Sequence, residues 1–370
     1  MSKVKVIQYI TSLNDGGAET LVKDYCLLLN KEKFEVKVVT LWLMGETSNL
    51  KMLRDNGIEI IVLFNRWNII SKILNKLFHK WYVAFLLKDV LVREKPDVIH
   101  THLELLQTLL PLRSFLKGTK LLYTCHSRPR NFLGDIRPKE HKAAVELIKS
   151  NHLQIIALHD DMADEINQLF SIDNTVVIKN GIDLRKYRNI VESKNDIRKS
   201  INIPEHAYVI GHVGRFNKIK NHSFLIEVFA NVIKHKTEAY LLLIGAGELE
   251  EQIHNKISSL GLSDRVIMLS HRSDVPRLLK AMDVLVFPSL YEGFGMVLIE
   301  AQAAGLPCYV SDTVNHSTFV SDHIYPLSLQ LGAEAWSDAI LTPTIKGRKV
   351  YDINSYDIRK EVRKLEQLYL

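Results

Sequence analysis

The chain has 370 residues, of which 46% are hydrophobic and 24% are charged, a balance typical of globular proteins and unlike that of disordered or collagen-like chains. Its net charge of +6 is small for this length and is spread along the sequence, which argues against nucleic acid as a partner. Three widely separated cysteines, Cys26, Cys125 and Cys308, argue against a disulfide framework or a zinc site. We therefore expect no metal, a reducing compartment and, from the length, two domains.

Apolar runs are short throughout the chain. The longest lies near Trp81 and falls well below the roughly eighteen residues that a membrane-spanning helix needs. The N-terminal apolar run is too short for a secretory signal. These features predict a cytoplasmic protein that is either soluble or peripheral on the inner face of the cell membrane.

The first half of the chain alternates short β-branched runs with longer helical patterns. This alternation is typical of parallel βαβ units. Strands are predicted at residues 4–10, 34–42, 58–64, 96–102, 120–126, 153–159 and 175–181.

A polar, charged segment at residues 183–207 then interrupts the pattern, and a second series follows. Its strands are predicted at residues 208–214, 239–245, 264–270, 283–289 and 306–312. We predict an α/β chain of two Rossmann-like, doubly wound domains, whose ligands bind outside the carboxyl ends of the strands. The domains are expected at 1–185 and 207–354, with a linker at 186–206 and a final helix at about 355–370. No element is assigned within 313–350.

Two loops carry glycines that suit an anionic ligand. Gly16 and Gly17 follow the first strand and open a helix, whose free N–H groups favour a phosphate. A tight strand-to-helix turn explains this pair equally well. Gly245 and Gly247 follow the strand at 239–245 and would also let a ligand approach the backbone.

Two cations and a histidine stand at predicted strand ends. Arg215 follows the strand at 208–214, and Lys220 lies just before the next helix, so the two could hold a diphosphate. His126 ends the strand at 120–126 and could exchange a proton with a substrate hydroxyl. The alternatives are a solvated pair of loop cations and a structural surface histidine.

Glu292 and Glu300 have seven residues between them, just after the strand at 283–289. If the segment were helical, they would lie about 12 Å apart along the axis, too far for a pair of glycosidase carboxyls at about 5 Å. They suit the two ends of one extended ligand better.

The stretch FPSLYEGFGMVLIEAQAAGLP, from Phe287 to Pro307, resembles the signature of retaining glycosyltransferases of family 4. These enzymes have the GT-B fold, two facing Rossmann-like domains with an interdomain cleft. Other motifs occur in the expected order: GGAE at 16–19, NGID at 180–183, VGRFNKIKN at 213–221 and LLIGAGEL at 242–249. The resemblance thus spans most of the chain. It also implies that the final helix packs back on the first domain.

The resemblance implies a role for each candidate residue. Arg215 and Lys220 would hold the diphosphate of the donor, Glu300 the ribose, and Glu292 the donor sugar. His126 would line the sugar and acceptor side, and Arg272 with Asp274 would lie near the base. The implied catalytic set is Glu292, His126, Arg215 and Lys220. The implied donor-binding set is Gly16, Gly17, Arg215, Lys220, Gly245, Arg272, Gly293, Phe294, Gly295, Met296, Val297 and Glu300.

The resemblance also implies a reaction. A hexose or N-acetylhexosamine would pass from a nucleotide-sugar, a UDP-sugar in preference to a GDP-sugar, to a glycan or lipid-linked acceptor. Transfer would retain the anomeric configuration, without metal, cofactor or protein nucleophile, in the synthesis of exopolysaccharide, capsule or another surface glycan. A sugar-nucleotide epimerase or phosphorylase on the same scaffold, and a non-catalytic nucleotide- or glycan-binding subunit, remain as alternatives.

Residues 66–95 combine an apolar stripe at helical spacing with seven basic and two acidic side chains. Tryptophan and lysine along such a stripe fit a helix lying in an anionic membrane interface. A core-facing helix with a solvated basic side is the alternative.

Overall fold

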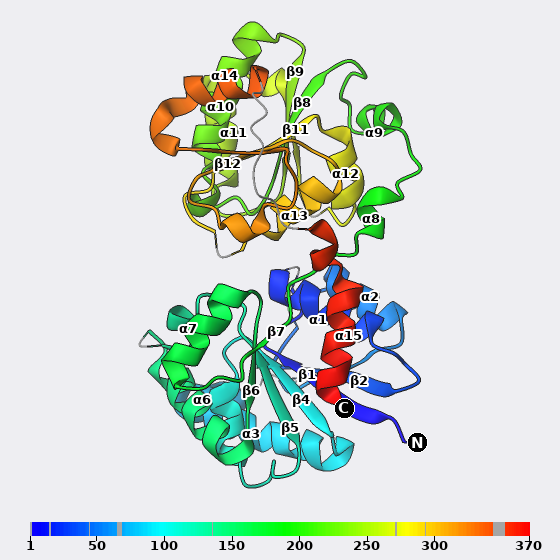
Figure 1. Cartoon of the computed structure of the whole chain (residues 1–370), viewed down its shortest axis with the longest axis vertical. Coiled ribbons are helices and arrows are strands. Elements are labelled where there is room, and N and C mark those ends of the chain that lie inside the picture. The colour runs from blue at the N-terminus through cyan, green and yellow to red at the C-terminus, as the bar shows by residue number, and fades with distance from the viewer. Residues whose placement is uncertain are drawn as a thin grey trace. The chain divides into compact units, whose positions relative to one another are not determined.

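The computed structural model describes residues 2–14, 16–43, 45–64, 69–134, 136–270, 272–292, 294–342 and 352–370. The chain forms two compact units (Figure 1). Unit 1 contains Met1–Gly181 and Ile358–Leu370, and unit 2 contains Ile182–Asp357. Each unit has its own sheet and is described by itself.

Unit 1 is built on a seven-stranded sheet in the order β3-β2-β1-β4-β5-β6-β7. All neighbouring strands are parallel. Its strands are β1 (Val4–Ile10), β2 (Phe34–Thr40), β3 (Glu59–Val62), β4 (Val98–His102), β5 (Lys120–Thr124), β6 (Gln154–Ala157) and β7 (Val176–Val177). Its helices are α1 (Gly17–Leu28), α2 (Ser48–Asp55), α3 (Ile69–Glu94), α4 (Leu106–Leu109), α5 (Pro129–Leu133), α6 (Pro138–Asn151), α7 (Asp160–Phe170) and α15 (Ile358–Tyr369).

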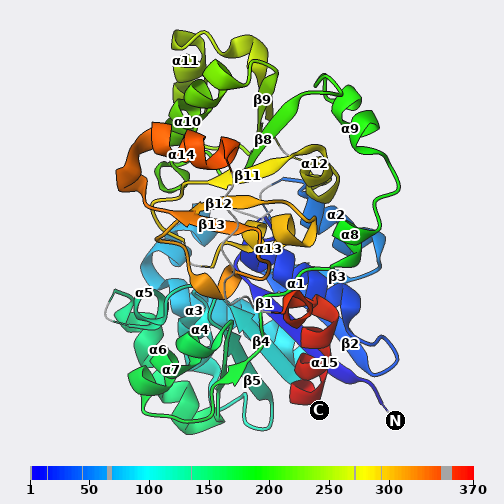
Figure 2. The same ribbon diagram turned by 45° about the horizontal axis from the view of Figure 1, so that its top comes forward.

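Unit 2 is built on a six-stranded parallel sheet in the order β10-β9-β8-β11-β12-β13. Figure 2 shows β8, β11, β12 and β13 following one another across it. Its strands are β8 (Tyr208–Val213), β9 (Ala239–Ile244), β10 (Val266–Leu269), β11 (Val284–Phe287), β12 (Cys308–Ser311) and β13 (Ile324–Leu327). Its helices are α8 (Arg185–Arg188), α9 (Lys194–Ser200), α10 (His222–His235), α11 (Glu250–Ser259), α12 (Val275–Ala281), α13 (Met296–Ala303) and α14 (Gly332–Leu341).

Both sheets are buried on their two faces, as parallel sheets require. In β9, Leu241 and Leu243 pack in one apolar cluster while Leu242 and Ile244 pack in another, because successive side chains point to opposite faces. The two sheets confirm the predicted fold class of two Rossmann-like domains. All twelve predicted strands are present, and β13 lies in the region to which no element was assigned.

The segment expected to be a linker differs from that prediction. Residues 185–200 contain α8 and α9, and the whole segment belongs to unit 2. Its polar sequence hides a buried ion pair: Arg198, only 5% exposed, donates to Asp283 Oδ2 at 2.6 Å. The same guanidinium donates to the carbonyls of Ala281 at 2.9 Å and Glu205 at 2.8 Å. Charged side chains of this segment therefore bind it to the rest of unit 2.

The C-terminal helix α15 lies in unit 1, although the sequence of unit 2 precedes it. Its buried residues Ile358, Val362, Leu365 and Tyr369 join the main apolar core of that unit. Figure 1 shows this helix, in red, beside α1.

The buried guanidinium of Arg198 yields a stability prediction. Arg198→Ala removes the buried guanidinium that donates to Asp283 and to two backbone carbonyls, while Asp283 keeps its ion pair with Lys194. Because buried acceptors lose their donor, the free energy of unfolding of unit 2 should fall by about 2–3 kcal/mol. Arg185→Ala is the matched control, because Arg185 is 59% exposed and pairs with nearby Asp183, so its loss should cost less than about 1 kcal/mol. Urea denaturation measures both. Equal losses in the two variants would contradict the anchoring role.

Candidate functional site

Each sheet reverses its strand order at one point, between β1 and β4 in unit 1 and between β8 and β11 in unit 2. Loops leave the carboxyl ends of these neighbouring strands in opposite directions, which opens a crevice where ligands of such folds bind. The predicted site residues of unit 2 follow β8 and β11.

The loop after β8 presents Arg215 on a rigid support. The amide of Gly214 donates to Ile244 O at 3.0 Å, the amide of Phe216 donates to Ala246 O at 2.9 Å, and Phe216 O accepts from the amide of Leu249 at 3.0 Å. The Arg215 side chain between these bonds is 71% exposed and lies 3.2 Å from Glu248. Arg215 is therefore held at its backbone while its guanidinium faces outward.

Gly245 has a structural reason of its own. Its φ is +155°, and a Cβ there would lie 2.0 Å from the carbonyl oxygen of Gly214. A Cβ on Gly247 would lie 2.5 Å from Phe216 O. The Cα atoms of these two glycines face protein backbone, so the loops after β8 and β9 can pack together. This packing positions Arg215.

Lys220 and Glu292 come together from the two strands that flank the reversal point. Lys220 Nζ lies 2.5 Å from Glu292 Oε1 and 4.5 Å from the centroid of the Phe287 ring. Both side chains are largely buried. The loop of Lys220 is bonded to the loop of Glu292, because the amide of Leu290 donates to Ile219 O at 2.8 Å.

The helix after Glu292 begins as predicted, at Met296. Gly295 caps it with φ +76°, a left-handed conformation that favours glycine. Val297 lies in the first turn, where amides have no partner within the helix, and Glu300 follows in the next turn. Phe294 packs against Tyr356 at 5.8 Å between ring centroids. The predicted residue Gly293 lies outside the described residues.

Arg272 and Asp274 bind each other. The Arg272 guanidinium donates to both carboxylate oxygens of Asp274, at 2.7 and 2.6 Å. This forked bond lowers the pKa of Asp274 and raises that of Arg272. Arg277, which also donates to Glu192, approaches the same carboxylate at 3.5 Å.

In unit 1, Gly16 and Gly17 stand at the start of α1, as predicted. A Cβ on Gly16 would lie 2.4 Å from a carboxylate oxygen of Glu19, whereas nothing lies within 4 Å of a Cβ on Gly17. The carboxylate of Glu19 thus already lies over the helix N-terminus, which favours negative charge. An added phosphate would have to share this position with Glu19.

His126 follows β5 and is the outer member of a buried polar cluster. Its Nε2 lies 2.9 Å from Nδ1 of His102, and His102 Nε2 lies 2.8 Å from Oε1 of Gln8. Burial lowers the pKa of His126 to about 4 and that of His102 well below its ordinary value. His126 is therefore neutral at pH 7, which suits hydrogen bonding to a hydroxyl better than delivery of a proton.

A cavity of about 370 Å³ lies at the reversal point of unit 1. It is lined by Thr11, Leu41, Trp42, Leu103, Glu104, Leu105 and Gln107. Beside it, the amide of Leu106 donates to Glu140 at 3.0 Å, and burial raises the pKa of Glu140 to about 7.

The sequence prediction did not include this cavity. A signal was present, because Trp42 and Glu104 each end or closely follow a predicted strand. Among the described residues, no group of three or more histidine, cysteine, aspartate and glutamate side chains is arranged to hold a metal ion.

Two family models match the chain, one in each half. Residues 15–186 match Glycosyltransferase Family 4, and residues 193–340 match Glycosyl transferases group 1. With two Rossmann-like units of this kind, the fold is that of the GT-B class. The chain belongs to the glycosyltransferases that combine these two domains.

Relatives and solved structures agree with this assignment. A UDP-Gal:alpha-D-GlcNAc-diphosphoundecaprenol alpha-1,3-galactosyltransferase of Escherichia coli is 27% identical over 100% of this chain and 97% of its own. The capsular polysaccharide biosynthesis glycosyltransferase CapH of Staphylococcus aureus is 24% identical over 99% of both chains. The fold resembles the crystal structure of Anabaena Alr3699/HepE in complex with UDP, with a TM-score of 0.72, 22% identity and 99% of both chains covered.

The buried histidines predict acid sensitivity. Burial lowers the folded-state pKa of His100 to about 3 and that of His126 to about 4, with His102 and His212 also lowered. The unfolded chain therefore binds more protons, and stability should fall as pH drops from about 6.5 towards 4, by up to about 1.4 kcal/mol per pH unit for each group. Glu140, whose pKa is raised, would by itself make the protein more stable on acidification, but the several buried histidines outweigh this single group.

Denaturation curves at stepped pH test this expectation. His126→Asn should flatten the loss of stability between pH 6.5 and 4, while His254→Asn, at an exposed position, should leave it unchanged. Stability that stays constant or rises on acidification would contradict it.

Proposed function

We propose that the protein transfers a hexose or N-acetylhexosamine from a nucleotide-sugar, a UDP-sugar in the first instance, with retention of configuration. The acceptor would be a glycan or a lipid-linked glycan in the synthesis of a cell-surface polysaccharide on the cytoplasmic side of the membrane. The observation that carries the proposal is the pairing of Lys220 with Glu292 at the strand-order reversal of unit 2, with Arg215 on the same loop as Lys220. The names of the Escherichia coli and Staphylococcus aureus relatives support the substrate classes.

The two cations would stabilise the departing diphosphate. Arg215 is exposed and can fork two oxygens, whereas Lys220 is a more buried point charge. Preorganised cations that face developing negative charge supply transition-state stabilisation of the kind that a metal supplies in other enzymes. A diphosphate beside Lys220 would share its ammonium and release Glu292 to bind hydroxyls of the donor sugar.

The start of α13 extends this donor site. Gly295 turns the chain so that the amides of the first turn, including that of Val297, can face an anion. Glu300, one turn further, would accept hydrogen bonds from the ribose. Because Glu292 is assigned to the hydroxyls of the donor sugar, no carboxylate is assigned as a nucleophile, and we propose displacement on the same face of the sugar through an oxocarbenium-like state.

The cavity of unit 1 suits the acceptor. Trp42 offers an aromatic face, and Glu104 with Gln107 offers polar groups, a combination that fits a sugar ring with its hydroxyls. Arg137 donates to Glu104 and holds the carboxylate in place. His126, at the same edge of the sheet, would add a neutral hydrogen-bonding group.

Donor binding and turnover test the proposal separately. Arg215→Ala and Lys220→Met should each weaken UDP binding about tenfold to a hundredfold in calorimetry and abolish transfer, because each removes a charge-assisted bond. Lys218→Ala is the control, since this exposed neighbour should leave both unchanged. Glu292→Gln should bind UDP but fail in transfer.

Several outcomes would overturn it. Wild-type turnover in both Arg215→Ala and Lys220→Met would contradict the proposed donor site. An isomerised nucleotide-sugar formed from donor alone would indicate an epimerase, and UDP-sugar binding without turnover across an acceptor panel would indicate a non-catalytic subunit.

We further propose that the outer face of α3 contacts an anionic membrane. Of the segment 66–95, residues 66–68 and the side chains of 69–79 lie outside the described residues. From Lys80 onwards, Trp81, Phe85 and Val92 are 58%, 71% and 51% exposed, and their spacing places them on one helical face. No helix of the described residues is long and apolar enough to cross a membrane, so this contact would be peripheral.

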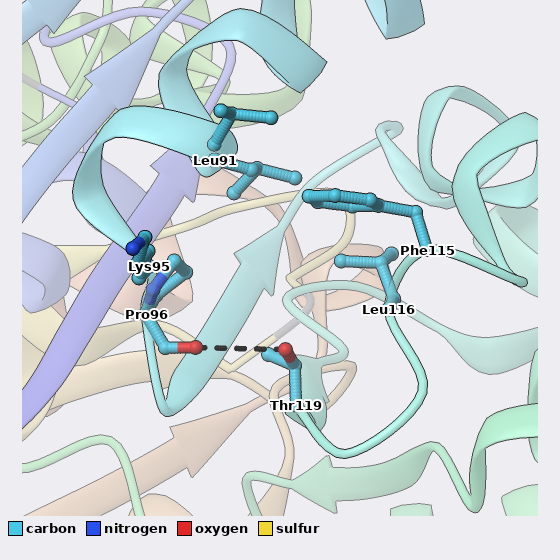
Figure 3. A pocket seen from close by; sticks show the side chains of 7 residues that line it. Leu91, Lys95, Pro96, Phe115, Leu116 and Thr119 are labelled. Carbon is cyan, nitrogen blue, oxygen red and sulfur yellow. Dashed lines mark hydrogen bonds between the residues drawn. The ribbon is translucent and has the colours of Figure 1, made fainter.

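An apolar cavity of about 340 Å³ continues this face. Figure 3 shows Leu91 of α3 facing Phe115 and Leu116 across it, with Lys95 at its edge. Lys80 lies 5.5 Å from the Trp81 ring and Lys88 lies 5.7 Å from the Phe115 ring, so ammonium groups border the exposed aromatics. Apolar groups with a cationic border match acyl chains beneath anionic headgroups.

Vesicle sedimentation tests the membrane contact. The protein should bind phosphatidylcholine vesicles that contain phosphatidylglycerol, and Phe85→Ser should weaken this binding about tenfold through lost apolar burial. Leu331→Ser is the matched control, because Leu331 is an exposed apolar residue of unit 2. Equal binding by wild type and Phe85→Ser, or no preference for anionic lipid, would argue against the contact.

A further inference from the structure

Six side chains form an unbroken line of hydrogen bonds through unit 1. From the inner end, Thr124 Oγ1 lies 2.7 Å from His100 Nε2, and His100 Nδ1 lies 2.7 Å from the hydroxyl of Tyr369. Gln8 Nε2 donates to that hydroxyl at 2.7 Å. The line continues from Gln8 Oε1 to His102 at 2.8 Å, and from His102 to His126 at 2.9 Å.

The orientation of the Gln8 amide sets the direction of the bonds along this line. Gln8 Nε2 donates to the Tyr369 hydroxyl, which can then donate its own proton to Nδ1 of His100, and His100 Nε2–H can donate to Thr124. On the other side, Gln8 Oε1 accepts from His102 Nε2–H, so Nδ1 of a neutral His102 carries a lone pair. That lone pair accepts Nε2–H of His126, which leaves Nδ1 of His126 unprotonated.

The line is sealed from solvent along most of its length. Gln8, His100, His102 and Thr124 are fully buried, and Tyr369 is 2% exposed. Water therefore cannot replace a lost partner, and reversing one bond would require every other bond to reverse as well. Burial also lowers the pKa of His100, His102 and His126, which keeps the line neutral at pH 7.

The outer end differs from the rest. His126 is half-buried at the carboxyl edge of the sheet, and its Nδ1 has no hydrogen-bond partner among the residues that the structure describes. A purely apolar interior would avoid burying so many polar groups. Burying these polar side chains costs desolvation free energy. The line ends at one nitrogen, Nδ1 of His126.

We infer that Gln8, His102 and Tyr369 are positioning residues that hold His126 in its Nε2–H tautomer, so that Nδ1 accepts a hydrogen bond from a substrate hydroxyl. This inference rests on the proposed function in assigning that hydroxyl to a sugar. It gives α15 a role in the site, because Tyr369 lies in the last turn of this helix. Related arrangements in other enzymes show that the group behind a histidine sets which nitrogen is presented.

Nitrogen NMR of protein labelled with ¹⁵N-histidine tests the inference without any assay of transfer. In the wild type, the His126 resonance, assigned by its loss in His126→Asn, should report a protonated Nε2 and an unprotonated Nδ1. In Tyr369→Phe the Gln8 amide can flip, because its Nε2 no longer donates to a hydroxyl, so His126 should become a mixture of tautomers. Tyr9→Phe is the matched control, because it removes another buried hydroxyl of unit 1, bonded to Thr108 at 3.0 Å, that lies outside the line.

Kinetics provide the second readout. Tyr369→Phe should lower kcat roughly tenfold relative to Tyr9→Phe, while KM for the donor stays within about twofold. If Tyr369→Phe fails to fold, His102→Phe cuts the line next to His126 and should also mix its tautomers.

The outcomes separate this inference from the proposed function. A His126 tautomer that is unchanged in Tyr369→Phe or His102→Phe, or a wild type with Nδ1 protonated, would overturn the inference even in an active enzyme. A fixed tautomer that mixes on cutting the line, in a protein that transfers no sugar, would uphold the positioning and refute the function.

Discussion

A parallel sheet covered on both faces leaves little room for water, and this constraint organises both units. A polar side chain buried in such a sheet is costly unless another group bonds it, and polar loops are confined to the strand ends. Unit 2 meets the constraint by pairing Lys220 with Glu292 beside β8 and β11. Unit 1 meets it with the hydrogen-bonded line from Thr124 to His126. In both units, the polar groups available for chemistry lie at the carboxyl ends of strands at or next to the point where the strand order reverses.

Backbone packing, more than ligand approach, explains several of the glycines. Gly245 and Gly247 allow the loops after β8 and β9 to touch, and that contact fixes the base of Arg215. Gly295 has a different task, because its positive φ starts α13. Glycines that look alike in a motif thus have different structural reasons, close backbone packing in one loop and a positive φ in another.

Segments distant in sequence complete each unit. Asp283, just before β11, receives Arg198 from the segment that appears from its composition to be a linker. Tyr369, at the end of the chain, reaches into the sheet of unit 1 between Gln8 and His100. Such buried charged and polar contacts fix which residues pack together, because a buried guanidinium or hydroxyl without its partner is costly.

The sequence by itself determined the α/β class, the motif order and twelve of the thirteen strands found in the described residues, because parallel strands are continuous apolar runs that need no partner to be recognised. It also placed Arg215, Lys220, His126 and Glu292 near strand ends and Glu300 in the helix that follows. Only the tertiary structure decided which of them meet: Glu292 with Lys220, and His126 with His102. It alone placed the cavity beside Trp42 and the burial of Arg198. These features depend on contacts between residues far apart in the chain, and periodicity along one strand or helix carries no information about them.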